Sequence, residues 1–144
     1  LNMEYELIQA ILANTISATN ISQILYKHSD SDILTGDHII CGLIYRLMNP
    51  MTDEEINKSL NDSNDLLNEE YNSSDEEELN TEIIDDTNSS KIPQKIKSNN
   101  CNCDICIQTR VCLLNFNDYT PNDALGDKFK NSIIETCHKY NRYI

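Results

Sequence analysis

The chain has 144 residues, with 24 Asp and Glu against 11 Lys and Arg, a formal net charge of −13 and six cysteines. This length predicts one domain with a modest core. The net charge argues against direct nucleic-acid binding by the chain alone. A polyanion repels an acidic chain unless the chain gathers its basic residues on one separate face.

Other functional classes also lack their sequence signals. The three glycines form no phosphate-binding loop, and no apolar stretch approaches the 18 residues of a membrane-spanning helix. Glu4 and Glu6 stand where a signal peptide would carry basic residues. We therefore expect no membrane association, no catalytic apparatus, and cysteines that are reduced or metal-bound rather than disulfide-bonded.

Two amphipathic helices are predicted in residues 1–50. The first ends near Lys27 and His28, and the second begins after Thr35 as N-cap and stops before Pro50. Their wide apolar faces cannot cover each other fully, so we expect a protein partner in a homo- or heterodimer. The candidate partner-binding residues are Leu7, Ile8, Ile11, Leu12, Ile40, Leu43, Ile44 and Leu47.

This helix–loop–helix resembles part of the histone fold. The segment from Ile33 to Ile40 is similar to the region where a Thr caps the last histone-fold helix and an acidic residue precedes apolar positions. The resemblance covers about 45 residues, counted from the chain. It implies pairing with a second histone-fold chain, whereas an ordinary helical hairpin in a small bundle remains the alternative.

The middle of the chain is strongly acidic. Thr52 and Glu55 form a capping-box pattern that starts a third helix, whose thin apolar face holds Ile56, Leu60, Leu66 and Leu67. Residues 72–100 are rich in Asn, Ser, Asp, Glu and Lys, which predicts an acidic disordered linker. The same acids could instead offer a site for a basic partner.

A terminal amphipathic helix is predicted from about 121 to 141. Thr120 as N-cap and Pro121 at the first helical position signal its start. Its apolar stripe comprises Leu125, Phe129, Ile133, Cys137 and Tyr140.

Four cysteines stand close together before this helix, and we expect them to bind one zinc ion, with a fifth cysteine in reserve. The candidate ligands are Cys101, Cys103, Cys106 and Cys112, with Cys137 as the reserve. Free reduced thiols and disulfides remain alternatives. His28 and His38, which lie in or near helix ends and loops, are interpreted as surface or capping residues rather than ligands, whereas His138 beside Cys137 remains an alternative source of one ligand.

The pattern Cys101-x-Cys103-x2-Cys106, followed by Tyr119-x-Pro121-x-Asp123, resembles a short Cys-rich C-terminal module of uncharacterised proteins in large nucleocytoplasmic DNA viruses. This resemblance implies a virion or virus-factory protein in the host cytoplasm. Without a viral source, the chain would be nuclear or cytoplasmic.

The sequence therefore predicts a mainly α protein in three parts. Residues 1–71 form a helical assembly domain, residues 72–100 the linker, and residues 101–144 a Cys-rich loop with the terminal helix. We expect a non-enzymatic structural or interaction protein. The alternative is a histone-fold-type subunit of a chromatin or transcription complex.

Overall fold

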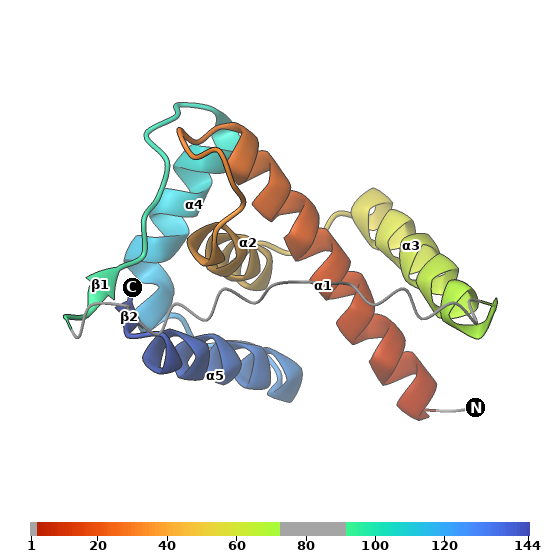
Figure 1. Cartoon of the computed structure of the whole chain (residues 1–144). Helices are drawn as coiled ribbons and strands as arrows, with labels where there is room; N and C mark the ends of the chain where they lie inside the picture. Colours follow the sequence, from red (N-terminus) through yellow and green to blue (C-terminus); the bar gives the residue numbers. More distant parts are fainter. Residues whose placement is uncertain (1–2, 73–91) are drawn as a thin grey trace.

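The computed structural model describes residues 3–72 and 92–144, and this part of the chain is mainly helical, as predicted. In chain order, its elements are α1 (Met3–Lys27), α2 (Gly36–Met48), α3 (Asp53–Asn72), β1 (Gln94–Lys95), α4 (Asp104–Asn115), the 3-10 turn η1 (Phe116–Asp118), α5 (Ala124–Lys139) and β2 (Arg142–Tyr143). Helix α2 packs on α1, and α4 and α5 pack on α2. Helix α3 lies against the N-terminal half of α1, away from the other helices (Figure 1).

The first two helices begin and end where their local signals predict. Helix α1 ends at Lys27, a basic residue that favours a helix C-terminus. Thr35 is the N-cap of α2: the His38 backbone N–H donates to Thr35 Oγ1 over 3.4 Å, and the Thr35 N–H donates to His38 Nδ1 over 2.9 Å. His38 is therefore a capping residue, and α2 ends at Met48, before Pro50.

Close approach of α1 and α2 depends on Gly42. A Cβ atom at this position would lie 2.5 Å from the carbonyl oxygen of Ala18 and 3.0 Å from the backbone nitrogen of Ser22. The first separation is shorter than real Cβ contacts and involves a rigid backbone atom, and the second is tight, so a residue without a side chain fits best where the helices cross.

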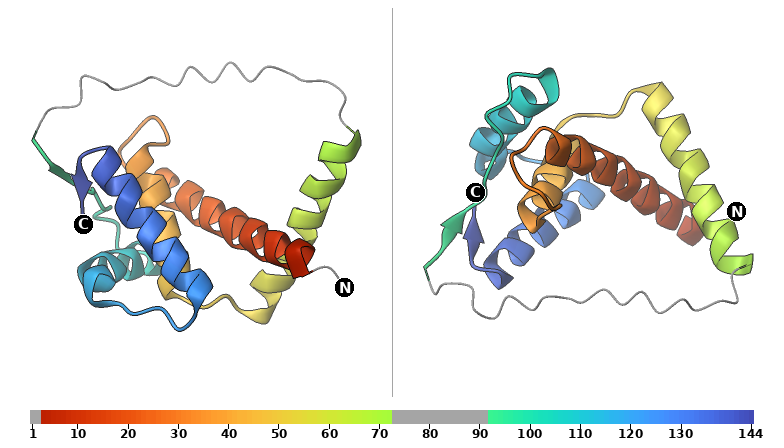
Figure 2. Two further views of the ribbon diagram at one scale, coloured as in Figure 1. Left: turned by 90° about the horizontal axis from the view of Figure 1, so that it is seen from below. Right: turned by 45° about the horizontal axis from the view of Figure 1, so that its top comes forward.

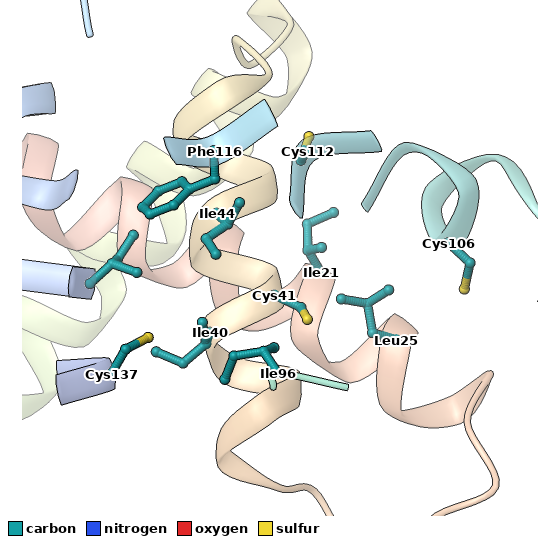
Figure 3. Packing of buried hydrophobic residues seen from close by; sticks show 11 residues of the cluster. Ile21, Leu25, Ile40, Cys41, Ile44, Ile96, Cys106, Cys112, Phe116 and Cys137 are labelled. Atoms are coloured by element: carbon teal, nitrogen blue, oxygen red, sulfur yellow. The ribbon is translucent and has the colours of Figure 1, made fainter. Parts of the chain in front are cut away.

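The N-terminal and C-terminal helices share one core. Its buried residues come from α1, α2, α4, α5 and the segments beside them, and Phe116 lies next to Ile44 (Figure 3). They are Ile21, Leu25, Ile40, Cys41, Ile44, Ile96, Cys106, Cys112, Phe116, Ile133 and Cys137. Residues 1–71 and 101–144, expected as separate units, thus bury their apolar faces against each other.

The end of the expected linker belongs to this fold. Residues 92–100 include β1, which pairs in parallel with β2 through Gln94 with Arg142 and Lys95 with Tyr143. Ile96 is buried in the core, and the Lys97 N–H donates to Asp37 Oδ2 over 3.1 Å. The prediction that this stretch is disordered is therefore wrong for residues 92–100, while residues 73–91 lie outside the described part of the chain.

The C-terminal part is more helical than expected, and its last helix starts later. Residues 104–115, expected as a Cys-rich loop, form α4. Helix α5 begins at Ala124 rather than near Pro121, because Asp123 rather than Thr120 is its N-cap: Asp123 Oδ1 accepts from the Gly126 N–H over 2.7 Å. After α5 the backbone of Asn141 adopts a positive φ of 56°, which turns the chain into β2.

Candidate metal centre

Three cysteines and one histidine converge beside the C-terminal end of α1. The ligand atoms of His28, Cys101, Cys103 and Cys106 all lie within 4.8 Å of one another. His28 follows the last residue of α1, Cys101 lies in the loop before α4, Cys103 is the N-cap of α4, and Cys106 is in its first turn. The cluster therefore joins two segments that are 73 residues apart, with His28 Nδ1 3.2 Å from Cys101 Sγ.

Two side chains hold the loop before α4 against the end of α1. Asn99 Nδ2 donates over 2.7 Å to the carbonyl oxygen of Leu25, in the last turn of α1, and lies 3.5 Å from Cys106 Sγ. From α4, Arg110 Nη1 donates to the carbonyl oxygens of Asn99 and Cys101. The loop is thus positioned by its own hydrogen bonds.

The thiols of the cluster differ in how readily they lose a proton. The backbone N–H of Cys106, in the first turn of α4, stabilises the thiolate of Cys103 and lowers the pKa of Cys103. Burial raises the pKa of Cys106 to about 11. Cys103 is therefore the first thiolate of this pair to form.

This donor set fits a structural zinc ion. Three thiolates and one imidazole are a known ligand set for such sites, and their donor atoms lie about 3.8 Å apart around a tetrahedral ion with Zn–S bonds of about 2.3 Å. The side chains of the cluster, with donor atoms within 4.8 Å, need only a small contraction to reach that arrangement. The four residues could hold a metal ion. Of the ligands expected from the sequence, Cys101, Cys103 and Cys106 come together in this cluster.

The other two expected ligands lie elsewhere. Because α4 is helical, Cys112 stands six residues beyond Cys106, about 9 Å along the helix axis. It is buried, and its Sγ accepts from Asn49 Nδ2 over 3.2 Å. Cys137 is on α5 in the apolar core, where burial raises its pKa, near Cys41, whose pKa is raised to about 12 for the same reason. Neither thiol belongs to the cluster.

The residue that sequence reasoning missed is His28. Its position after Lys27 favoured a capping role, and no local spacing linked it to cysteines 73 residues away. The only available signal was that a histidine at a helix end is exposed enough to bind a metal when another segment approaches it.

The residues expected to bind a partner have three different environments. Ile40 and Ile44 are buried within the chain, because α4, η1 and α5 cover the face of α2 that was expected to need a partner. By contrast, Leu7, Ile8 and Ile11 in the N-terminal half of α1 are exposed by 51, 48 and 37%. Leu12 is half-buried, and Leu43 and Leu47 line a cleft between α1, α2 and α5.

No family model, curated protein or solved structure matches this chain. Among the described residues, no helix combines the length and apolar character needed to cross a membrane.

Proposed function

We propose that this chain is a non-enzymatic interaction protein whose helices are held together by one structural Zn²⁺ bound to His28, Cys101, Cys103 and Cys106. The observation that carries the proposal is the convergence of these ligand atoms from two segments 73 residues apart. Thiols this close together in a reducing compartment are typical of a metal site.

A structural role is favoured over a catalytic one by the number of ligands. Catalytic zinc keeps one coordination position open for water or substrate, with three protein ligands. Here three cysteines and one histidine would supply four ligands and fill a tetrahedron. The ion would have no free position at which to activate a substrate.

The core gives the metal a physical purpose. The described core holds a single aromatic side chain, Phe116, and three of its members are cysteines on α4 and α5. Zinc binding adds free energy that the unfolded chain cannot gain, so binding energy becomes folding energy. The ion would fix the end of α1 to the start of α4, where few other contacts join these helices.

The exposed side chains of α1 support the interaction role. Met3, Leu7, Ile8 and Ile11 crowd the first three turns of the helix, and Met3 is exposed by 82%. Contiguous apolar surface of this kind marks sites of protein association. The ion would hold the C-terminal end of α1 in place, while the N-terminal end of this helix contacts a partner.

A histone-fold-type subunit remains the second candidate. It is favoured by the size order of the helices, since α1 has 25 residues and α2 has 13, joined by a short loop. The burial of Ile40 and Ile44 by α4, η1 and α5 weighs against it, because histone-fold chains bury such faces against a second chain. Heterodimer formation through α2 would favour this candidate.

Metal analysis of the full chain, purified with zinc present and under reducing conditions, tests the proposal. We expect one zinc per chain, and spectra of the cobalt-substituted protein typical of tetrahedral thiolate coordination. His28→Ala and Cys103→Ser should each lower metal affinity strongly. Cys112→Ala and Cys137→Ala are the matched controls, and their zinc content should stay at one per chain.

Two results would contradict the zinc proposal. One is a zinc content below about 0.2 per chain with normal folding in a chelator. The other is a loss of zinc in Cys112→Ala as large as that in His28→Ala, in a protein whose circular dichroism is unchanged.

A further inference from the structure

The exposed apolar residues of α1 continue a line that enters the core. Leu7, Ile11, Asn14, Ala18, Ile21 and Leu25 follow one another at intervals of four, three, four, three and four residues, so they share one helix face. The last two are buried in the core, and the first two are exposed. We call the part from Leu7 to Ala18, together with the neighbouring Ile8, the α1 stripe.

The α1 stripe faces away from α3. Helix α3 meets the opposite side of α1, where Gln9 Nε2 donates to Asn64 Oδ1 over 2.8 Å and Ser59 and Ser63 of α3 are buried. The two views in Figure 2 show the N-terminal half of α1 extending past α2 and α5, with α3 on one side. No described helix therefore covers Leu7, Ile8 and Ile11.

At its inner end the α1 stripe opens into a cleft of about 260 Å³ between α1, α2 and α5. Asn14 and Ala18 of the stripe form one wall. The other walls are mainly apolar and include Leu43, Leu47, Leu125 and Phe129. A helix laid along the stripe could thus insert an apolar side chain into the cleft at one end.

The charges around this surface select its partner. Glu4 lies three, four and seven residues before Leu7, Ile8 and Ile11, so it shares their face at the outer end. At the inner end the cleft is lined by Asp123 and also by Arg46, whose Nη1 is paired with Glu55 Oε2 over 2.9 Å. Residues 1–72 carry twelve acids and three bases, so a second copy of this chain would be repelled, whereas a basic segment would be attracted.

We propose that the α1 stripe and its cleft bind a cationic amphipathic helix of a partner protein. From Leu7 to Ala18 the stripe measures about 17 Å at 1.5 Å per residue, which suits a partner helix of about three to four turns. Its apolar residues at intervals of three and four would cover Leu7, Ile8 and Ile11, and lysine or arginine near its ends would meet Glu4 and Asp123. This inference rests on the interaction role proposed above but not on the metal.

Designed peptides test the proposal on the full, zinc-loaded chain. The cationic probe is a labelled helical peptide of about 15 residues, with leucines at intervals of three and four and lysines on its flanks. One control peptide has glutamates in place of the lysines, and another has the same composition in scrambled order. Fluorescence anisotropy should show saturable binding of the cationic probe, weaker at higher salt, and at least tenfold weaker binding of both controls.

Protein variants localise the binding. Leu7→Asp and Ile11→Asp should each weaken binding of the cationic probe at least tenfold, although the added carboxylate would strengthen a purely electrostatic attraction. Leu66→Asp is the matched control, because Leu66 lies on α3 and is exposed by 45%, close to the 51% of Leu7. The affinity of Leu66→Asp for the cationic probe should stay within twofold of that of the original chain. Glu4→Gln should reduce the salt dependence of probe binding.

Several outcomes would overturn this proposal. They are equal binding of the three peptides, equal effects of Leu7→Asp and Leu66→Asp, and no saturable binding up to about 1 mM. A dimer in sedimentation equilibrium that Leu7→Asp dissociates would assign the surface to a second copy instead. Zinc content and circular dichroism of each variant separate failure of this proposal from failure of the metal site.

Discussion

The two halves of α1 share one helix face but have opposite environments. In the C-terminal half, Ile21 and Leu25 are buried against α2, and the helix ends beside the cluster of His28, Cys101, Cys103 and Cys106. In the N-terminal half, Leu7 and Ile11 on the same face are exposed. The difference shows that the chain covers its own apolar surface at one end of α1 and leaves it for a partner at the other.

This contrast has a structural cause. Helices α4 and α5 reach only the part of the core around α2, whereas α3 packs on the opposite side of α1 through small residues such as Ser59 and Ser63. The contacts that determine the free energy of unfolding should therefore lie mainly at the end of the molecule that holds the cluster of His28 and the three cysteines. Four changes, from the largest expected effect to the smallest, test that comparison.

Removal of the metal should have the largest effect. Zinc-finger peptides gain about 10–16 kcal/mol from their metal, so we expect a chelator to lower the free energy of unfolding by about 5 kcal/mol or more. Hydrogen exchange should accelerate most around residues 99–112 and the end of α1, because the cluster joins these segments. Uniform acceleration along α1 and α3 would contradict the expected division of stability.

Two leucines of one helix face offer a direct comparison. Leu25 is exposed by 2% and Leu7 by 51%. Leu25→Ala should cost about 2–5 kcal/mol, because it leaves a cavity in the core. Leu7→Ala should change stability by less than about 0.5 kcal/mol. Urea unfolding of both variants measures the difference, and similar costs would mean that the N-terminal half of α1 is covered after all.

The crossing of α1 and α2 can be loosened at one glycine. Gly42→Ala should cost about 1–3 kcal/mol, because the added methyl group would collide with the Ala18 carbonyl and force the helices apart. Gly36→Ala is the matched control, since a Cβ atom at Gly36 meets nothing within 4 Å. We expect Gly36→Ala to be neutral or slightly stabilising in thermal unfolding. Equal stability of the two variants would show that the helices do not pack closely at this point.

The smallest effect is a pH dependence at the cap of α2. Burial lowers the pKa of His38 from its usual 6.5, and its Nδ1 accepts a hydrogen bond from the Thr35 N–H. The His38 imidazole therefore binds a proton more readily in the unfolded chain than in the folded one. The contribution of this cap to the free energy of unfolding is fully present above pH 6.5 and falls as the pH is lowered from 6.5 toward the folded-state pKa. We expect a loss of about 0.5–1 kcal/mol, typical of a lost helix cap.

His38→Gln separates this effect from zinc release in acid. Glutamine can accept the same backbone hydrogen bond in a capping box but does not titrate. The difference in stability between the original chain and His38→Gln should therefore vary between pH 7 and pH 5.5, while both lose zinc alike. A constant difference would exclude His38 as a titrating cap.

The starts and ends of the first helices were predictable because their causes are local. Thr35 caps α2 through a neighbour three residues away, and Pro50 stops the helix that ends at Met48. The predicted start of α5 was three residues too early. Thr120 and Asp123 both satisfy the local cap pattern, but only Asp123 forms the capping hydrogen bond.

The sequence by itself determined the mainly helical fold and three of the candidate ligands, because cysteine density and helix periodicity are properties of neighbouring residues. Only the tertiary structure places His28 beside Cys101 and places Cys112 and Cys137 outside the cluster. It also decides that Ile40 and Ile44 are buried under α4, η1 and α5. Each of these outcomes depends on how segments far apart in the chain pack together. No periodicity or spacing within one segment encodes that packing.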